Sequence, residues 1–141
     1  MKTLFIFLII AIRTFTVTAQ NDPDRILGVW TSDEKDSHVE IYKYANTYCG
    51  RIIWIKDPYD KNGYPKRDIN NPDPKKRAQK IVGMTMLTGL KYKNNQWVSG
   101  SIYGPRRGAY ANCDIKMDDK GQLHITVYQG MLSATKIWTR L

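Results

Sequence analysis

Short segments in which hydrophobic and polar residues alternate fill most of the chain. In 38–44, for example, Val39 and Ile41 alternate with polar residues. A period of two is typical of a β-strand with one buried face. Together with short apolar runs between turn formers, the alternation predicts strands at 26–31, 38–44, 49–55, 84–87, 96–103, 109–117, 122–128 and 134–140.

Two of these segments depart from simple alternation. Residues 49–55 (CGRIIWI) are apolar on both faces, which is typical of a central strand. In the other, Gly83 and Gly89 limit the predicted strand to 84–87. About eight strands with mostly short, turn-rich joints predict an all-β fold, either an antiparallel barrel or a sandwich.

One joint, 56–80, is long and rich in proline. Four prolines fall between Pro58 and Pro74, where they end regular strand pairing. Asp73 as an N-cap, with Pro74 in the first helical position, predicts one or two helical turns. We interpret 68–77 (DINNPDPKKR) as a structural plug or lid over the barrel.

The first 19 residues have the pattern of a secretory signal peptide. Lys2 precedes an apolar run at 4–12, and small residues end the segment at Ala19. The apolar run is too short to span a bilayer, which needs roughly 20 residues. We therefore expect residues 1–19 to be removed, residues 20–141 to form one domain without a transmembrane segment, and the protein to reside in the periplasm or outside the cell.

The chain is basic, and removal of Lys2 and Arg13 lowers its formal charge from +9 to +7. Such a charge suits anionic envelope components or, more simply, solubility. A nucleic-acid-binding surface usually interleaves basic residues with stacking aromatics, and the sequence has no such stripe. We expect no nucleic-acid partner.

Cys49 and Cys113 are the two cysteines. An export compartment permits a disulfide between them, but two buried free thiols are an equal alternative. His38 and His124 lie outside metal-ligand spacing of either cysteine, and the Asp and Asn residues of 57–73 do not have calcium-loop spacing. We predict no metal site and no cofactor, and the sequence nominates no catalytic residue.

The two ends of the predicted domain carry complementary residues. Gly28 and Trp30 lie in the first strand, and Arg140 ends the last one. In a closed barrel these strands are neighbours, so the Arg140 guanidinium can cover the Trp30 ring in a cation–π contact. We therefore expect Gly28, Trp30 and Arg140 to close one end of a barrel.

A resemblance to a known family extends from Gly28 to Arg140. The matching stretches are GVW, VEIY, YCGRIIWIKDPYDKNGYPKRDINNPDPKKR, GMTMLTGLK, GSIYGPRRGAYANC and IWTR. They resemble domain of unknown function 2147 (DUF2147), a family of secreted bacterial proteins, and the G-x-W start with a terminal arginine resembles a lipocalin-like, or calycin, barrel. The resemblance implies a single small antiparallel barrel of about eight strands, exported by a Gram-negative bacterium, and no established activity.

Our leading functional hypothesis is a non-enzymatic barrel that binds a small, partly apolar ligand in its open mouth. An eight-stranded barrel has room for packed side chains or for one small ligand. The candidate cavity-lining residues are Trp54, Trp97, Tyr103 and Tyr128, and further candidate binding residues are Asp57, Asn71, Asp73 and Arg77.

Two alternatives remain open at this point. One is an interaction module that holds an anionic envelope component on the basic residues of the proline-rich segment, with phosphate binding at the amide end of the predicted helix. Those residues are Lys75, Lys76, Arg77 and Lys80. The other is an enzyme that acts on envelope material, because fold alone does not determine function.

Overall fold

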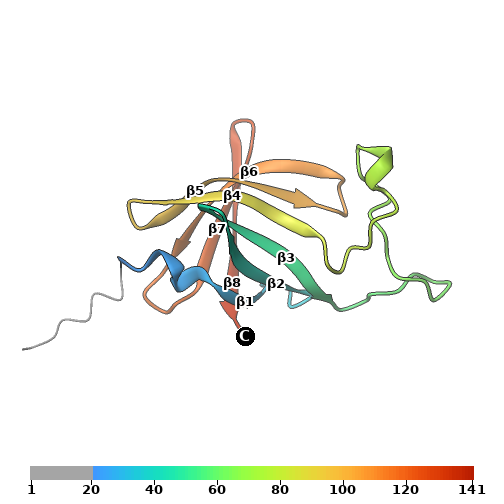
Figure 1. Cartoon of the computed structure of the whole chain (residues 1–141), viewed down its shortest axis with the longest axis horizontal. Helices are drawn as coiled ribbons and strands as arrows, with labels where there is room; N and C mark the ends of the chain where they lie inside the picture. Colours follow the sequence, from blue (N-terminus) through green and yellow to red (C-terminus); the bar gives the residue numbers. More distant parts are fainter. Residues whose placement is uncertain (1–20) are drawn as a thin grey trace, which may run out of the picture.

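The computed structural model describes residues 21–141, and the predicted signal peptide lies outside this range. Eight strands form one closed antiparallel barrel in which each strand pairs with the next and the last pairs with the first (Figure 1). The fold class predicted from the alternation is therefore confirmed. The strands are β1 Gly28–Thr31, β2 Ser37–Tyr44, β3 Thr47–Ile55, β4 Thr85–Lys93, β5 Gln96–Gly104, β6 Ala109–Met117, β7 Leu123–Gln129 and β8 Leu132–Arg140.

Two 3₁₀ helices complete the described structure. The helix η2, Pro23–Ile26, replaces the start of the first predicted strand. The helix η3, Pro74–Lys76, has Asp73 as its N-cap, as expected, but it is a single turn.

The strand β4 is longer than its glycines predicted. It continues through Gly89, which adopts a left-handed φ of +73°. The pairing register between β3 and β4 shifts next to Gly50. A local irregularity of this kind lets a strand bend without ending, so glycine here marks curvature rather than a strand terminus.

The inward-facing side chains fill one half of the barrel. Along β7, Leu123 and Ile125 point inward and have no exposed surface. The other apolar side chains of residues 21–141 that are completely enclosed are Ile26, Trp30, Leu87, Leu90, Trp97 and Ile115.

The helix η2 closes this filled end of the barrel. The Trp30 indole donates to the Ile26 carbonyl at 2.9 Å, and the Trp97 indole donates to the Pro23 carbonyl at 3.0 Å. Each buried indole therefore obtains the hydrogen-bond partner that it needs, and the two bonds fasten η2 to β1 and β5.

Arg140 joins the first and last strands at the same end. It pairs with Trp30 across β1 and β8, and its guanidinium lies over the Trp30 ring, 4.2 Å from the ring centre. It also donates to the carbonyls of Leu27 and Arg25 at 2.7 and 2.6 Å. Gly28 leaves room for this side chain, since a Cβ there would lie 2.5 Å from Nη1 of Arg140. The contact expected from the two ends of the sequence is present.

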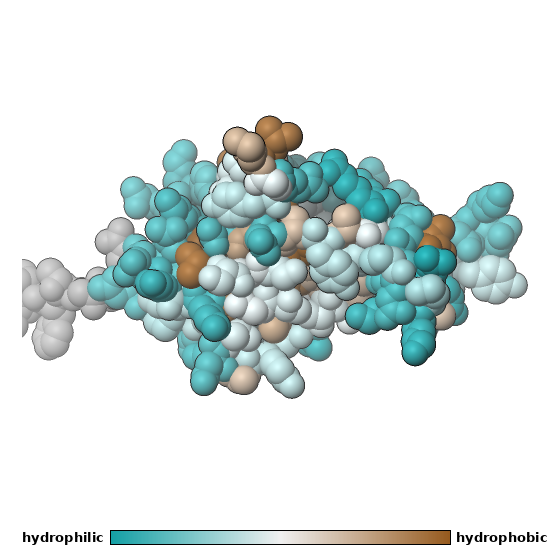
Figure 2. Space-filling view, turned by 90° about the horizontal axis from the view of Figure 1, so that it is seen from above, coloured by the Kyte–Doolittle hydropathy of each residue, from teal (hydrophilic) through white to brown (hydrophobic). Residues whose placement is uncertain are grey.

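The two ends of the barrel differ in what surrounds them. Figure 1 shows η2 at one end and the long β3–β4 connection, which carries η3, extending from the other. In the view of Figure 2 the surface is mostly hydrophilic, with hydrophobic residues in small separate spots.

Candidate functional site

A cavity of about 880 Å³ occupies the half of the barrel away from η2. This volume lies within the range of roughly 300–1,000 Å³ that is typical of small-molecule sites. Its apolar lining consists of Ile52, Ile55, Ile81, Met86, Ile102, Ala109, Ala111, Val127, Leu132, Ala134 and Trp138.

Small side chains on two strands keep the cavity open. On β6, Ala109 and Ala111 share the inward face with Ile115, which is fully buried at the closed end. On β8, Ala134 shares the inward face with Trp138. On β6 the inward residues thus change from large to small toward the mouth, and on β8 Ala134 is the small residue between Lys136 and Leu132, which also line the cavity.

Charged residues surround the mouth. The acidic ones are Glu34, Asp36 and Asp57, and the basic ones are Lys56, Lys66, Arg106, Arg107 and Lys136. Arg106 donates to Asp36 at 2.6 Å and lies 3.7 Å from Glu34, which also lies 3.7 Å from Lys136. Burial raises the pKa of Asp36, but hydrogen bonds from Ser32, Arg106 and Ser37 lower the pKa by more. The pKa of Asp36 therefore lies below its ordinary value of 3.8.

The remaining rim charges are mostly positive. Within residues 21–141, three rim cations form no ion pair: Lys56, Lys66 and Arg107. Among the acidic rim residues, Asp57 also forms no ion pair. The mouth therefore presents an excess of cationic groups above an apolar interior.

The segment 68–77 does not cover this mouth, which corrects the interpretation of it as a plug or lid. None of its residues lines the cavity, to which the β3–β4 connection contributes Lys56, Asp57, Lys66 and Ile81. The segment instead packs against the outside of the β5–β6 hairpin.

A buried polar cluster holds it there. The Tyr103 hydroxyl donates to Asp68 at 2.7 Å, and the Asn71 amide donates to the other carboxylate oxygen at 2.6 Å. Asp68 has no exposed surface and Asn71 is 2% exposed. Tyr103 pairs with the exposed Tyr110, so its side chain lies on the outer face of the barrel. Burial, followed by the bond to Asp68, raises the pKa of Tyr103.

The other predicted site residues of this segment have structural contacts. The Asp73 carboxylate accepts from the Lys75 amide at 3.0 Å, so it occupies the amide end of η3 that was considered for phosphate binding. Arg77 Nε donates to the Asn71 carbonyl at 2.8 Å. Asp57 differs from both, because it lies at the cavity mouth.

Three of the four aromatic residues predicted to line the cavity do not do so. Trp54 stacks on His38 on the outer face, with ring centres 4.3 Å apart, because a register shift between His38 and Val39 turns it outward. Trp97 is buried at the closed end, where it contacts η2. Tyr103 is the one of the four candidates that lines the cavity, at its rim. The tryptophan that lines the cavity is Trp138.

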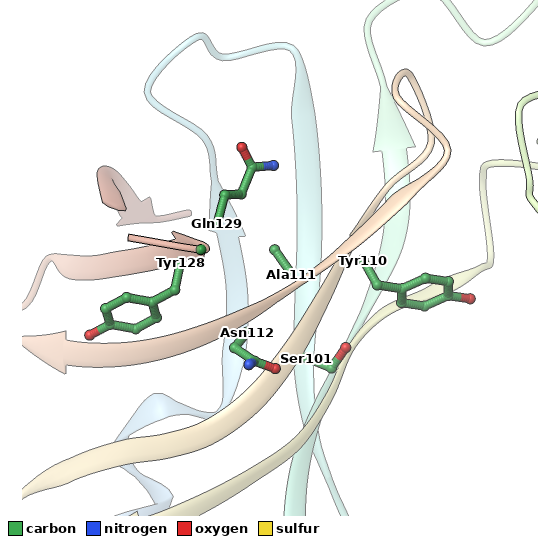
Figure 3. A pocket seen from close by; sticks show the side chains of 7 residues that line it. Ser101, Tyr110, Ala111, Asn112, Tyr128 and Gln129 are labelled. Carbon is green, nitrogen blue, oxygen red and sulfur yellow. The ribbon is translucent and has the colours of Figure 1, made fainter. Parts of the chain in front are cut away.

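Tyr128, the fourth candidate, lies at a separate hollow on the outer face. This hollow of about 410 Å³ is lined by residues of β5, β6 and β7 and by Gly130 of the following turn. Figure 3 shows Ser101 and Asn112 between Tyr110 and Tyr128, whose rings point away from each other. Tyr128 donates to Asp114 at 3.2 Å, and burial followed by this bond raises its pKa.

Cys49 and Cys113 are both buried free thiols. Cys113 pairs with Gly100 and Val127 and faces inward, whereas Cys49 pairs with Tyr42 on the outward face. Their side chains therefore point to opposite sides of the barrel wall. Burial raises the pKa of the Cys113 thiol to about 12.

Over residues 21–141, no group of three or more His, Cys, Asp or Glu side chains is arranged to hold a metal ion. No helix in the described part of the chain is long and apolar enough to cross a membrane.

The sequence did contain a signal for the cavity that the aromatic residues did not give. Alanine occupies both inward positions at the start of β6, Ala109 and Ala111, and a third alanine, Ala134, lines the cavity from the last strand, where it pairs with Val127. Small residues on the inward face of a barrel strand indicate unfilled space, and lysines flanking the long connection indicate a charged rim. Lys56 and Lys66 were missed because they precede and follow turns, where exposed lysine is ordinary.

Comparisons with known proteins agree with this architecture. Residues 28–140 match a family model described as "Uncharacterized protein conserved in bacteria (DUF2147)". Among solved structures, the chain is similar to HP1028 from the human pathogen Helicobacter pylori, described as belonging to the lipocalin family. The TM-score is 0.72, the identity is 24%, and the match covers 82% of each chain. No curated protein was found to match.

Proposed function

Because the chain belongs to the DUF2147 family of uncharacterised bacterial proteins and folds as a lipocalin-like barrel, we propose that it binds a small amphipathic anion inside the barrel. The apolar part of the ligand lies against the lining between Ile52 and Trp138, and its acidic group lies at the rim near Lys56 and Lys66. The site works by binding, and we assign it no chemical step.

The observation that supports this proposal is the gradient from an apolar interior to a cationic mouth. A ligand chain that enters the cavity is removed from water, which contributes roughly 25 cal/mol for each Å² of apolar surface buried. A carboxylate or phosphate at the rim remains partly hydrated and gains charge-assisted hydrogen bonds from lysine or arginine. A neutral apolar ligand would leave these cations without a counterion.

We also propose that the protein acts in the bacterial envelope. This proposal rests on the signal-peptide pattern of residues 1–19. A soluble carrier of amphipathic anions has an evident use there, because such molecules partition into membranes and cross an aqueous space slowly.

A fluorescent fatty acid tests the ligand proposal. Undecanoic acid carrying a dansyl group at its far end combines an apolar chain with a carboxylate. Its emission should increase and shift to the blue when it is titrated with residues 20–141. The variant Ala134→Trp fills the cavity and should weaken binding by about tenfold or more. A probe with the same chain and a quaternary ammonium head should bind less tightly.

Thr135→Trp is the matched control, because it adds the same side chain to the next position of β8. The Thr135 hydroxyl contacts Thr126 at 3.2 Å on the outer face of the barrel, so this variant leaves the cavity open. Equal affinities of both variants and the wild type would show that the probe does not enter the cavity. Equal affinity for the two head groups would refute the role of the rim.

A further inference from the structure

The turn between β7 and β8 exposes two apolar side chains at the cavity mouth. Met131 is 103% exposed and Leu132 is 77% exposed, while Gln129, Leu132 and Ser133 are part of the cavity wall. Figure 1 shows this hairpin projecting beyond the neighbouring strands. The tip is therefore both the most exposed apolar point of the described chain and part of the rim.

Two other tight turns of the barrel do not share this composition. The β4–β5 turn contains Asn94 and Asn95, and the β6–β7 turn contains Asp118 and Asp119. Polar residues and glycine are usual in hairpin turns because they tolerate the backbone angles and contact water. Gly130, with φ +59°, already supplies the left-handed residue of the β7–β8 turn, so the turn itself requires neither methionine nor leucine.

Basic residues accompany the apolar tip around the mouth. Lys56, Lys66 and Arg107 lie on the rim and are not neutralised by a carboxylate of residues 21–141. Lys136 follows the tip on β8 and lies 3.7 Å from Glu34. An apolar wedge beside uncompensated cations fits an anionic lipid surface, which offers hydrocarbon below a layer of phosphates.

We propose that the protein docks with its cavity mouth against an anionic bilayer. Met131 and Leu132 insert between the lipid headgroups, and the rim cations contact the lipid phosphates. This inference goes beyond ligand binding, and it does not depend on which ligand occupies the barrel. It gives the mouth a second role, because a cavity held against a bilayer can exchange an amphipathic molecule without passing it through water.

A lipid surface suits this tip better than a protein partner does. A stable protein interface buries on the order of 1,000 Å² or more and has an apolar centre. Two side chains on a projecting hairpin, on a molecule whose visible surface is otherwise mostly hydrophilic, are too few for such a centre. They are sufficient for shallow insertion that charge attraction reinforces.

Vesicle sedimentation tests the proposal with residues 20–141 and no added ligand. Vesicles of phosphatidylethanolamine and phosphatidylglycerol should bind the protein, and vesicles of phosphatidylcholine should bind it at least about tenfold less. The double variant Met131→Asp with Leu132→Asp should lose about tenfold or more of its binding to the anionic vesicles. Raising the salt concentration should weaken wild-type binding, because the rim cations are screened.

The matched control places the same changes at the closed end. Tyr44 and Leu141 are 69% and 64% exposed, and Tyr44→Asp with Leu141→Asp adds the same charge and removes a similar apolar area. This variant should lose only the binding that follows from its altered net charge, which is less than the hairpin variant loses. Equal losses in the two variants would show that charge alone, and not the tip, governs binding.

A fluorescent label at the tip gives a second, local measurement. Met131→Cys can be labelled with an environment-sensitive dye, because Cys49 and Cys113 are only 6% and 1% exposed. Its emission should shift to the blue with anionic vesicles, and the same dye on Leu141→Cys should not respond. An unchanged spectrum at the tip, or a shift caused by raising the protein concentration without vesicles, would overturn the proposal. The latter result would instead indicate contact with a second copy.

Discussion

At the scale of single residues, the carboxylate of Asp68 determines where the long connection lies. It is fully buried and accepts hydrogen bonds from Tyr103 and Asn71. A buried polar group without its partner costs about 1–3 kcal/mol. The three side chains therefore stabilise one position of the connection, on the outside of β5 and β6. In other positions the Asp68 carboxylate would lose one or both of these hydrogen bonds.

Tyr103→Phe should therefore lower the free energy of unfolding by about 1–3 kcal/mol, because it leaves one oxygen of the buried Asp68 side chain without its donor. Tyr110→Phe is the matched control. The ring centre of Tyr110 lies 4.6 Å from that of Tyr103, but Tyr110 is 55% exposed. Removal of the Tyr110 hydroxyl should therefore cost less than about 0.5 kcal/mol of unfolding free energy. Urea unfolding of the two variants measures the difference, and equal costs would contradict the role of the hydroxyl.

At the scale of elements, the connection and the β5–β6 turn fit each other through Gly108. The Asn70 amide donates to the Arg106 carbonyl at 3.1 Å, and a Cβ on Gly108 would lie 1.8 Å from the Asn70 carbonyl oxygen. The backbone of one element thus occupies the space that a side chain of the other would need. Glycine is required here by contact as well as by its φ of +61°.

Gly108→Ala should release the connection from the hairpin, and trypsin should then cleave within 56–80 at least about tenfold faster. Gly130→Ala is the control with the same backbone strain, since its φ is +59° and its Cβ would meet nothing within 4 Å. This control should cost about 1 kcal/mol and leave the cleavage rate within 56–80 unchanged. Similar rates for the two variants would show that strain, not contact, explains Gly108.

The sequence predicted elements better than it predicted which side each residue faces. Alternation identifies strands such as β6 and β7 because successive side chains of a barrel strand point inward and outward in turn. It did not place Trp54, because the register shift near His38 reverses the alternation, and it did not extend β4 through Gly89. The contact of Asp68 with Tyr103 joins residues 35 positions apart, and no local pattern encodes it.

At the scale of the whole molecule, the barrel has a fixed end and an open end. The fixed end includes Asp24, whose carboxylate accepts from the Tyr48 hydroxyl at 2.5 Å and from the Lys43 ammonium at 2.9 Å. The bond from Tyr48, followed by that from Lys43, lowers the pKa of Asp24 below its ordinary value of 3.8. Ionised Asp24 thus connects η2 to β2 and β3.

This shift predicts how stability depends on pH. A carboxyl group whose pKa is lowered by folding contributes stability above its unfolded value, and the contribution is lost as the pH falls through the folded value. Asp24→Asn should therefore lower the melting temperature at about pH 7, and its difference from the wild type should shrink toward about pH 3. Asp119→Asn, in an exposed turn, should change little at either pH. A difference for Asp24→Asn that stays constant with pH would contradict this account.

The contact between Arg140 and the first strand also has a consequence for the lifetime of the fold. Arg140 and Leu27 are 113 positions apart, and the seam between β1 and β8 comprises the two pairs Trp30–Arg140 and Thr31–Thr139. Bringing such distant strands together costs loop-closure entropy that neighbouring hairpins do not incur, so we expect this seam to form after the transition state of folding. Interactions that form late slow unfolding without speeding folding, and Arg140 therefore acts mainly on how long the barrel, once closed, stays closed.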